Sequence, residues 1–289
     1  MNIIGRRKFF YALSLIIIGA GLLGLIFNHG LNLGIDFRSG TIIEVDLRQS
    51  ATTEQLREVL NPFDLGSTNI RAIGTNGAEY EIKTATLDEM KLTSVMAGIR
   101  SKWPEVVAQV PATVAPAFSA GLVKQALWAL LISFVGIVLY ITWRFEFKFA
   151  ISAIIALVHD VLVVIGFFAI FRIEVNSEFI AALLTIIGFS INDTIVIFDR
   201  IRENLGSAKK IGNLEKLAND SILQTMSRSL RTSTTTLLAT SSILVFGGVT
   251  LRPLTTALVV GMISGVYSTV FVASSIWVDW KQKTLSKQA

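Results

Sequence analysis

Cysteine is absent from the sequence, and this absence excludes several kinds of chemistry. Disulfides, thiolate catalysis, iron–sulfur clusters and zinc–thiolate sites all require cysteine. Histidine is scarce as well, because His29 and His159 are the two in the chain, too few for a histidine-rich metal centre. We therefore expect neither a bound metal nor a cofactor.

The sequence also lacks the motifs of several enzyme classes. It has no Walker A loop, no HExxH pair and no nucleophile elbow. No segment is suited to hydrolyse a nucleotide, and we do not expect an enzyme that makes or breaks covalent bonds. If the protein does work, the energy comes from an ion gradient or from a partner.

Charged residues are few, at 16% of the chain, whereas soluble domains usually carry about 25%. Mean hydropathy is +0.61. The apolar residues gather in runs of roughly 20, the length that the core of a lipid bilayer requires. They predict a polytopic α-helical membrane protein with six transmembrane helices. The runs are Phe9–Phe27, Ala126–Trp143, Phe149–Phe171, Phe179–Phe198, Arg228–Phe246 and Leu254–Val278.

The fifth run, Arg228–Phe246, differs from the others. Its clearly apolar part, Leu237–Phe246, is about half the length that spanning needs. To cross the membrane it must also include the polar stretch 231–236. Such a helix is poorly suited to face lipid, so we expect it inside the helical bundle.

The basic residues predict how the chain crosses the membrane. A basic cluster precedes the first run, which is longer than the apolar region of about 7–15 residues in a signal peptide and is interpreted as an uncleaved anchor. Loops predicted on the same side of the membrane as the amino terminus are rich in lysine and arginine, whereas the two short loops on the other side hold only Arg172 and Arg252. We expect both termini to be cytoplasmic, in the cytoplasmic (inner) membrane. This bias also explains the pI of about 9.5 without nucleic acid as a partner.

The chain is predicted to have four parts. Residues 1–27 form the cytoplasmic amino terminus and the first span, and residues 28–124 form an exported domain. Residues 125–280 hold the other five spans, and residues 281–289 are a cytoplasmic tail.

The exported segment has alternating apolar residues and frequent charges, which predict a folded α+β domain. Its first helix begins after Thr52 or Thr53 as the cap, and a turn is expected at Gly74–Gly77. The order β-α-β-β-α-β is that of a ferredoxin-like domain. The predicted elements are strand 41–47, helix 53–60, strands 69–73 and 79–84, helix 87–103 and strand 106–110.

Charged residues within the spans are the candidates for function, because such residues are costly and usually face an interior, a partner or a water path. Asp193 lies in the fourth span, and Arg228 and Arg231, three residues apart, share a face of the fifth. A carboxylate opposite one arginine forms a salt bridge that protonation releases, which lets helices repack. The alternative is a static ion pair that only orders the bundle.

Other intramembrane polar residues are assigned supporting roles. His159 and Asp160 point about 100° apart on one helix, so we do not expect both to face one site. Thr235 and its neighbours in 232–236 either line a wet path or, as we favour, bond to their own backbone. Gly261 and Gly265 form a GxxxG pair that permits close helix packing.

Four stretches of the sequence resemble the SecD/SecF family of protein-export membrane proteins. The most specific is Gly188–Asn204, which resembles the fourth-span signature of the SecF branch. Residues 33–40 resemble the start of the family's exported domain, and residues 227–233 and 265–274 resemble its fifth and sixth spans. With the arrangement of one span, a domain and five spans, the resemblance covers nearly the whole chain.

The resemblance implies a fold, partners and a role. It implies half of a bundle of the resistance-nodulation-division type, paired with SecD, and it implies that proton flow helps a preprotein through the SecYEG channel, with YajC as a further partner. The family's proton-coupling residues correspond to Asp193 and Arg228, with Asn192 as a polar neighbour. Further positions match the family motifs, namely Asp36, Phe37, Gly40, Asp199 and Arg200.

Two positions depart from the family pattern. Ser39 stands where the family usually has the first of two glycines, so this turn is expected to differ. Arg231 stands where an apolar residue is common, which leaves open which arginine meets Asp193.

Two other functions fit parts of the sequence. One is a half-size proton-driven exporter of small molecules or lipids from the same superfamily, although such pumps usually have much larger exported domains. The other is an inert scaffold that presents the domain to partners, although a scaffold has no need of charges within the bilayer.

Overall fold

The computed structural model describes residues 2–73, 76–207 and 213–286. The chain divides into two compact units. A helical unit comprises residues 1–32 and 128–289, and an α+β unit comprises Leu33–Leu127. Part of the predicted turn, residues 74–75, and the end of the predicted tail, residues 287–289, lie outside the described residues.

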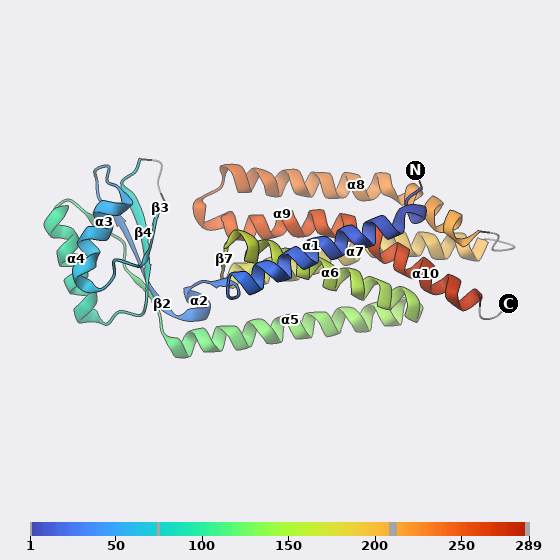
Figure 1. The fold of residues 1–289 in the computed structure, drawn as a ribbon, viewed down its shortest axis with the longest axis horizontal. Coiled ribbons are helices and arrows are strands. Elements are labelled where there is room, and N and C mark those ends of the chain that lie inside the picture. Colours follow the sequence, from blue (N-terminus) through green and yellow to red (C-terminus); the bar gives the residue numbers. More distant parts are fainter. Residues whose placement is uncertain (1, 74–75, 208–212, 287–289) are drawn as a thin grey trace. The chain divides into compact units, whose positions relative to one another are not determined.

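Long helices make up the helical unit (Figure 1). A 3₁₀ turn at Ile4–Arg6 precedes the first helix, another at Val249–Leu251 precedes α9, and the short strands β1 (Asn32–Leu33) and β7 (Glu174–Val175) follow α1 and α6. The π-helical segment Ser268–Ala273 joins α9 to α10 without a break. The helices are α1 (Arg7–Phe27), α5 (Pro116–Arg144), α6 (Phe147–Phe171), α7 (Ser177–Ser207), α8 (Leu214–Phe246), α9 (Arg252–Tyr267) and α10 (Ser274–Leu285).

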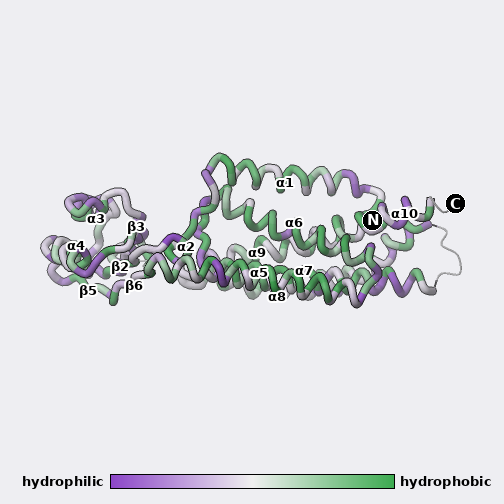
Figure 2. The backbone as a smooth tube through the Cα atoms, turned by 90° about the horizontal axis from the view of Figure 1, so that it is seen from below, coloured by the Kyte–Doolittle hydropathy of each residue, from purple (hydrophilic) through white to green (hydrophobic). Residues whose placement is uncertain are grey.

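Five helical stretches of the described chain are long and apolar enough to cross a membrane. Figure 2 shows the apolar colour along α1, α5 and α6. Each stretch contains one of the predicted apolar runs, and they are Ile4–Phe27, Pro116–Arg144, Phe147–Phe171, Ser177–Ser207 and Val249–Leu285. The chain is therefore a mostly helical, multi-pass membrane protein.

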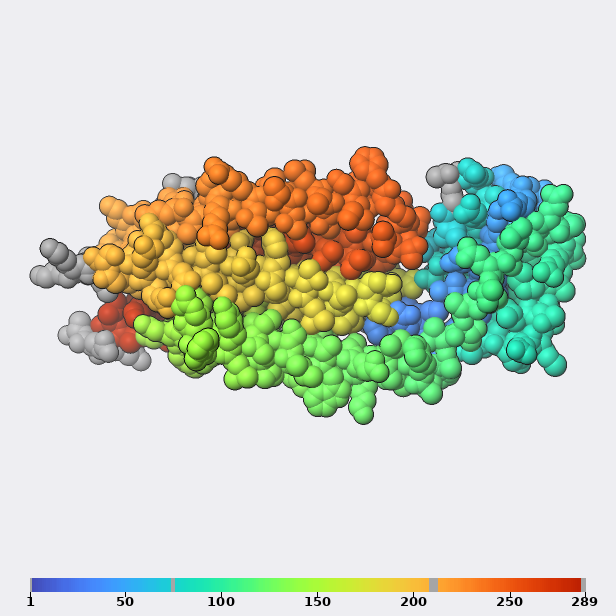
Figure 3. All heavy atoms as spheres, turned by 180° about the vertical axis from the view of Figure 1, so that it is seen from behind, coloured from blue at the N-terminus to red at the C-terminus, as the bar shows by residue number. Residues whose placement is uncertain are grey.

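The helix α8 is not among these five stretches, although it is 33 residues long. Its polar residues lower its hydropathy, as the sequence of 228–236 suggests. Within this chain α8 packs on α7 and α9 through one face, which includes Ser229, Ser233 and Thr240. The opposite face, with Leu238 and Val245, is exposed, so the prediction that α8 lies inside the bundle holds for one face only. Figure 3 shows α8 beside α7 on this side of the helical unit.

Glycine pairs let the helices approach closely. A Cβ on Gly21 of α1 would lie 2.7 Å from the Cα of Gly166 on α6, so these two backbones touch. A Cβ on Gly261 of α9 would lie 2.2 Å from the side chain of Ile186 on α7. Gly265 meets Ser190 of α7 in the same way, at 3.1 Å. The GxxxG pair thus packs α9 against α7, as predicted.

The α+β unit contains one five-stranded sheet with two helices on one face (Figure 1). The strand order is β3-β4-β2-β5, with β6 also paired to β2, and the pairs are antiparallel. Alternate residues of β2, such as Ile43 and Val45, face the helices, where they pack with Leu56 and Ile99. The elements are α2 (Ile35–Arg38), β2 (Gly40–Asp46), α3 (Thr53–Leu60), a 3₁₀ turn (Asn61–Phe63), β3 (Asn69–Ala72), β4 (Glu79–Thr84), α4 (Glu89–Lys102), β5 (Val107–Ala108) and β6 (Ala112–Val114).

The helix starts of this unit follow capping rules. Thr52 accepts a hydrogen bond from the backbone of Gln55, whose side chain accepts one from Thr52, which is a capping box. Asp88 caps α4 by accepting from the backbone of Lys91. Thr52, one of the two predicted caps, is therefore the residue that starts α3. The predicted last strand, 106–110, is instead two short strands, because the chain leaves β2 between Ala108 and Ala112.

Candidate functional site

Asp193 lies on α7 and is 5% exposed. Its carboxylate faces α8, where the Ser233 hydroxyl donates a hydrogen bond to Oδ2 at 3.4 Å. Both residues belong to stretches that the sequence singles out for the fourth and fifth spans. Ser229 of α8 also faces this carboxylate. A buried carboxylate with hydroxyl partners alone is poorly compensated as an anion, and this makes it suited to take up a proton.

The two candidate arginines lie on α8, the helix that Asp193 faces, but they do not pair with this carboxylate. Arg228 and Arg231 are exposed, and in the described part of the chain no basic side chain lies within 4.0 Å of Asp193. The predicted salt bridge is thus not formed in this structure, and the arginines line the face of α8 that this chain leaves open.

Asp160, assigned only a supporting role from the sequence, is the most densely hydrogen-bonded buried carboxylate. It lies on α6 and is 1% exposed. Oδ2 accepts from the hydroxyls of Ser190 at 2.6 Å and Ser268 at 2.8 Å, and Oδ1 accepts from Ser264 at 2.6 Å. These serines come from α7, α9 and the π-helical segment, so a single carboxylate joins four parts of the bundle.

His159 extends this network to α1. Its Nδ1 lies 3.1 Å from Oδ1 of Asp160, and its Nε2 lies 3.1 Å from the hydroxyl of Ser14. Ser14 in turn lies 3.2 Å from the hydroxyl of Tyr267, which donates to the carbonyl of Phe10 at 2.7 Å. The expectation that the two side chains would not share a site is wrong, because they point to different helices and still bond to each other.

The sequence gives a weak signal for this network. Ser264 and Ser268 are four residues apart, on one face of a helix, and they continue the spacing of Gly261 and Gly265. Small residues at this spacing are most often read as packing positions. The long-range partners Ser14 and Ser190 have no such local signal, so the network is visible only in the fold.

The other polar candidates do not line a shared site. Thr235 donates to the backbone carbonyls of Arg231 and Thr232 at 3.1 and 2.8 Å, and Thr236 likewise bonds to its own helix. This confirms the favoured interpretation that these hydroxyls satisfy their own backbone. Asn192 is exposed on the side of α7 away from the buried Asp193.

The family-motif residues near the end of α7 form ion pairs. Asp199 forms ion pairs with Arg144 of α5 at 3.2 Å and with Arg202 at 3.1 Å. Arg200 contacts Glu203 at 2.6 Å and donates to Gln224 of α8 at 2.6 Å. These contacts join the last turns of α7 to α5 and α8.

The motif residues of the α+β unit surround a tight turn. Asp36 and Phe37 lie half-buried in α2, and Gly40 starts β2. A Cβ on Gly40 would lie 2.5 Å from the carbonyl oxygen of Thr84, at a φ of +151°, so only glycine fits there. Ser39 has a φ of +63°, in the region that favours glycine.

A further charged cluster, not predicted from the sequence, ties α1 to α8 and α10. Arg7 contacts Asp279 at 2.7 Å and Glu215 at 3.0 Å, and Tyr11 donates to Asp279 at 3.0 Å. A hydrogen bond from Gln282, followed by Arg7, lowers the pKa of Glu215 below its usual value. The sequence does not reveal this cluster, because Arg7 and Tyr11 lie about 200 or more residues before Glu215 and Asp279.

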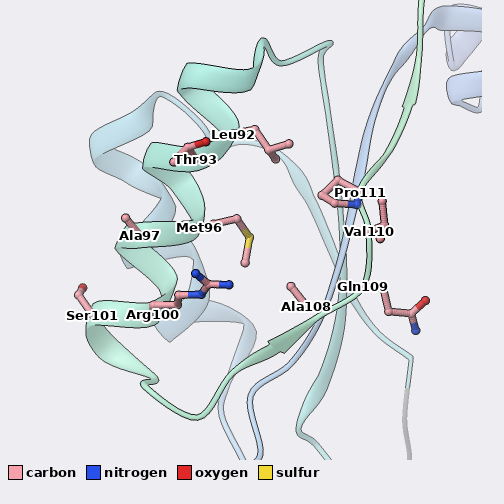
Figure 4. Close-up of a pocket in the computed structure, with 10 residues that line it drawn as sticks. All are labelled: Leu92, Thr93, Met96, Ala97, Arg100, Ser101, Ala108, Gln109, Val110 and Pro111. Carbon is pink, nitrogen blue, oxygen red and sulfur yellow. The ribbon is translucent and has the colours of Figure 1, made fainter.

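The α+β unit has a surface hollow of about 770 Å³ between α4 and the β5–β6 segment (Figure 4). Met96 and Arg100 of α4 point toward the strand side, where Ala108 and Gln109 lie. The hollow is lined by one basic group, by the amide of Gln109 and by small or apolar residues, and no carboxylate or histidine is among its described lining residues.

The fold and these sites define a class: a multi-pass membrane protein with an α+β unit inserted after its first helix and buried carboxylates within the bundle. The model of the family "Protein export membrane protein SecD/SecF, C-terminal" matches residues 96–283, and that of the SecD/SecF GG motif matches residues 24–51. The chain therefore belongs to the SecD/SecF family of protein-export membrane proteins. The motif matches although Ser39 replaces a glycine.

Individual relatives agree with this assignment. Protein translocase subunit SecF of Alicyclobacillus acidocaldarius is 38% identical over 99% of this chain and 94% of that protein. Protein translocase subunit SecDF of Bacillus subtilis is 36% identical over 98% of this chain but only 38% of its own length. The crystal structure of SecDF, a translocon-associated membrane protein from Thermus thermophilus, matches with a TM-score of 0.88 and 32% identity, over 98% of this chain and 39% of that one.

Proposed function

We propose that the protein is an accessory subunit of the Sec protein translocase that, with SecD, uses the proton gradient to promote export of unfolded preproteins. The SecYEG channel, YajC and the translocating preprotein are its proposed partners. The relatives named as translocase subunits support the accessory role. The proposal makes the chain no enzyme in the bond-making sense.

We further propose that α8 is a sixth transmembrane helix. Its face with Leu238 and Val245 is exposed in this chain, and an apolar face next to Arg228 and Arg231 suits a partner helix better than water. SecD is the proposed occupant. The Bacillus and Thermus relatives named SecDF are chains more than twice this length, which supports a fold in which two such halves lie together.

The topology and the class of the exported domain are also proposals. Both termini are cytoplasmic in this proposal, and residues 28–124 are extracytoplasmic. The domain is ferredoxin-like, which the strand order and the antiparallel pairing support.

The observation that supports proton coupling is the buried Asp193, which faces α8 and lacks a close cationic partner among the described residues. In its ionised form it attracts Arg228 across the α7–α8 contact. Protonation removes that attraction, and the helices repack. A cycle of protonation and release thus becomes a cycle of helix movement.

Asp193→Asn tests this proposal in cells. Secretion of a model preprotein and its dependence on the proton gradient are both expected to be lost, because the amide cannot exchange a proton. The matched control is Thr185→Ala, an exposed position of the same helix whose hydroxyl bonds only to its own backbone. Unchanged secretion in Asp193→Asn, with normal membrane assembly, would remove the proposal.

A second comparison identifies the arginine. Arg228→Met is expected to impair secretion more than Arg231→Met, because Arg228 is the position that corresponds to the family's proton-coupling arginine. A defect confined to Arg231→Met would reassign the pair.

A further inference from the structure

The hydrogen-bond network around His159 and Asp160 ends at a backbone carbonyl, and this fixes which group donates in each neighbouring bond. The carbonyl of Phe10 can only accept, so Tyr267 uses its one hydroxyl hydrogen for that bond at 2.7 Å. Tyr267 must then accept from Ser14 across the 3.2 Å contact. Ser14 therefore has no hydrogen left for His159.

The imidazole of His159 makes two contacts, and each of them needs a hydrogen. The 3.1 Å contact between Ser14 Oγ and His159 Nε2 needs a hydrogen on Nε2. The 3.1 Å contact between Nδ1 and Asp160 Oδ1 needs another, held by either atom. An ionised aspartate beside a neutral histidine supplies only one of these two hydrogens. The complete set of bonds requires one proton more.

The serines around Asp160 cannot supply that hydrogen. Ser190 and Ser264 each donate their hydroxyl hydrogen to a carboxylate oxygen at 2.6 Å, and Ser268 donates to Oδ2 at 2.8 Å or to the carbonyl of Gly265 at 3.2 Å. The extra proton therefore belongs to the His159–Asp160 pair.

We propose that His159 and Asp160 together bind one transferable proton, and that its presence changes the hydrogen bonds of Ser14 on α1 and of Tyr267. Binding adds one H⁺ to the pair and moves no electrons. When the proton leaves to water, the imidazole keeps one hydrogen. If it stays on Nδ1, Ser14 must turn to donate to Nε2, and one contact of Tyr267 is lost; if it stays on Nε2, the contact with Asp160 is lost.

Few other ionisable groups surround the pair. It faces Ser14 on α1, Ser190 on α7, and Ser264, Tyr267 and Ser268 on α9 and the π-helical segment. Of these described contacts, only Tyr267 is ionisable. Asp193 of α7 instead bonds to α8, and Tyr11 of α1 bonds to Asp279 of α10. The proton site is thus distinct from that of Asp193. This inference rests on the proposed function in one respect, which is that proton-driven export would use the bound proton.

The scarcity of histidine makes the site measurable. A His29→Asn variant of the full chain, labelled with ¹⁵N in imidazole and held with SecD in lipid nanodiscs, carries His159 as its one histidine. Nitrogen NMR across a pH series reports whether Nε2 holds a hydrogen. We expect hydrogens in both the Nε2–Ser14 and the Nδ1–Asp160 contacts at the low-pH end of the series, and the loss of one of these contacts at the high-pH end.

Variants of the surrounding hydroxyls sharpen the test. Ser14→Ala removes the acceptor of the Nε2 hydrogen, so the share of His159 side chains that carry a hydrogen on Nε2 is expected to fall. Ser14→Thr restores the hydroxyl and the wild-type value. Ser152→Ala is the matched control, since this equally buried serine of α6 bonds only to the carbonyl of Lys148.

Two outcomes overturn the inference. One is an Nε2 that lacks a hydrogen throughout the pH series, and the other is identical titration in the parent and in Asp160→Asn. Should Ser14→Ala fail to assemble, Tyr267→Phe gives the same test, because it frees the Ser14 hydrogen for Nε2. Asp193→Asn is expected to leave the titration unchanged, so a failure here and a failure of the proposed function are distinguishable.

Discussion

Ser39 adopts φ 63° and ψ 163°, a combination that is almost confined to glycine. Such strain costs on the order of 1–3 kcal/mol. Ser39→Gly is therefore expected to raise the free energy of unfolding of the α+β unit by about 1 kcal/mol, measured by denaturant melting. Ser39→Ala keeps the Cβ and is the control; equal stabilisation by both changes would contradict the strain argument.

For single residues, the sequence predicts which side chains are functional candidates better than it predicts which residues they contact. Asp193 is predictable because a carboxylate in an apolar run is rare and costly. Its contact with Ser233 is not, since residues 40 positions apart come together only through the crossing of α7 and α8. The same reason explains why Asp160 is undervalued: its three serines lie on other elements, and each alone resembles a packing residue.

Among the helices, the close approach of α1 to α6 depends on two glycines, Gly21 and Gly166. Gly21→Ala places a methyl group 2.7 Å from the Cα of Gly166, so the helices must separate. We expect a loss of about 1–3 kcal/mol in stability, seen as a lower melting temperature in detergent. Gly19→Ala, on the same helix with open space around it, is the control and is expected to be neutral or stabilising. Equal effects would show that the crossing is not close-packed.

Glu215 makes the α1–α8 contact sensitive to pH. Its folded pKa lies below the ordinary value of 4.5, so its stabilising contribution is present above that value and is lost as pH falls through the folded pKa. Wild type is expected to melt above Glu215→Gln at pH 7, with a difference that shrinks below about pH 4.5. A difference that is constant with pH would exclude this contact as the cause.

Elements with strong local signals are predictable, and those set by tertiary pairing are not. Strand Glu79–Thr84 and helix Thr53–Leu60 appear at the predicted residues, because alternation and a capping box define them. Helix α7 continues to Ser207, beyond the apolar run, because its ion pairs around Asp199 support it outside the apolar stretch. The split of the last strand into β5 and β6 includes Pro111, which lacks a backbone N–H, but the pairing of both pieces with β2 is seen only in the fold.

The whole molecule consists of two units with separate cores. Ile82, fully buried in the α+β unit, packs only within that core. Ile82→Ala is expected to cost about 2–5 kcal/mol there and to leave the helical unit unchanged. Hydrogen exchange with mass spectrometry is expected to show faster exchange over residues 40–114 alone. Met90→Ala, at an exposed position of the same unit, is the control, and faster exchange in the helices would contradict separate cores.

At this scale the sequence predicts the insertion of a folded domain after the first span, because the change from apolar to alternating pattern is abrupt. It cannot predict which faces of the helices remain open. The exposed face of α8 is visible only once the packing with α7 and α9 is known.

The π-helical segment Ser268–Ala273 changes the phase of the last span. In a regular α-helix Gly265 and Asp279, fourteen residues apart, would point within about 40° of each other. Here Gly265 meets Ser190 of α7, whereas Asp279 meets Arg7 and Tyr11 of α1. Removing a single residue from the segment would turn Asp279 by about 100° and separate it from both partners. The length of this segment is therefore constrained separately from its side chains, because a change of length displaces Asp279 even when every side chain, Ser268 included, is kept.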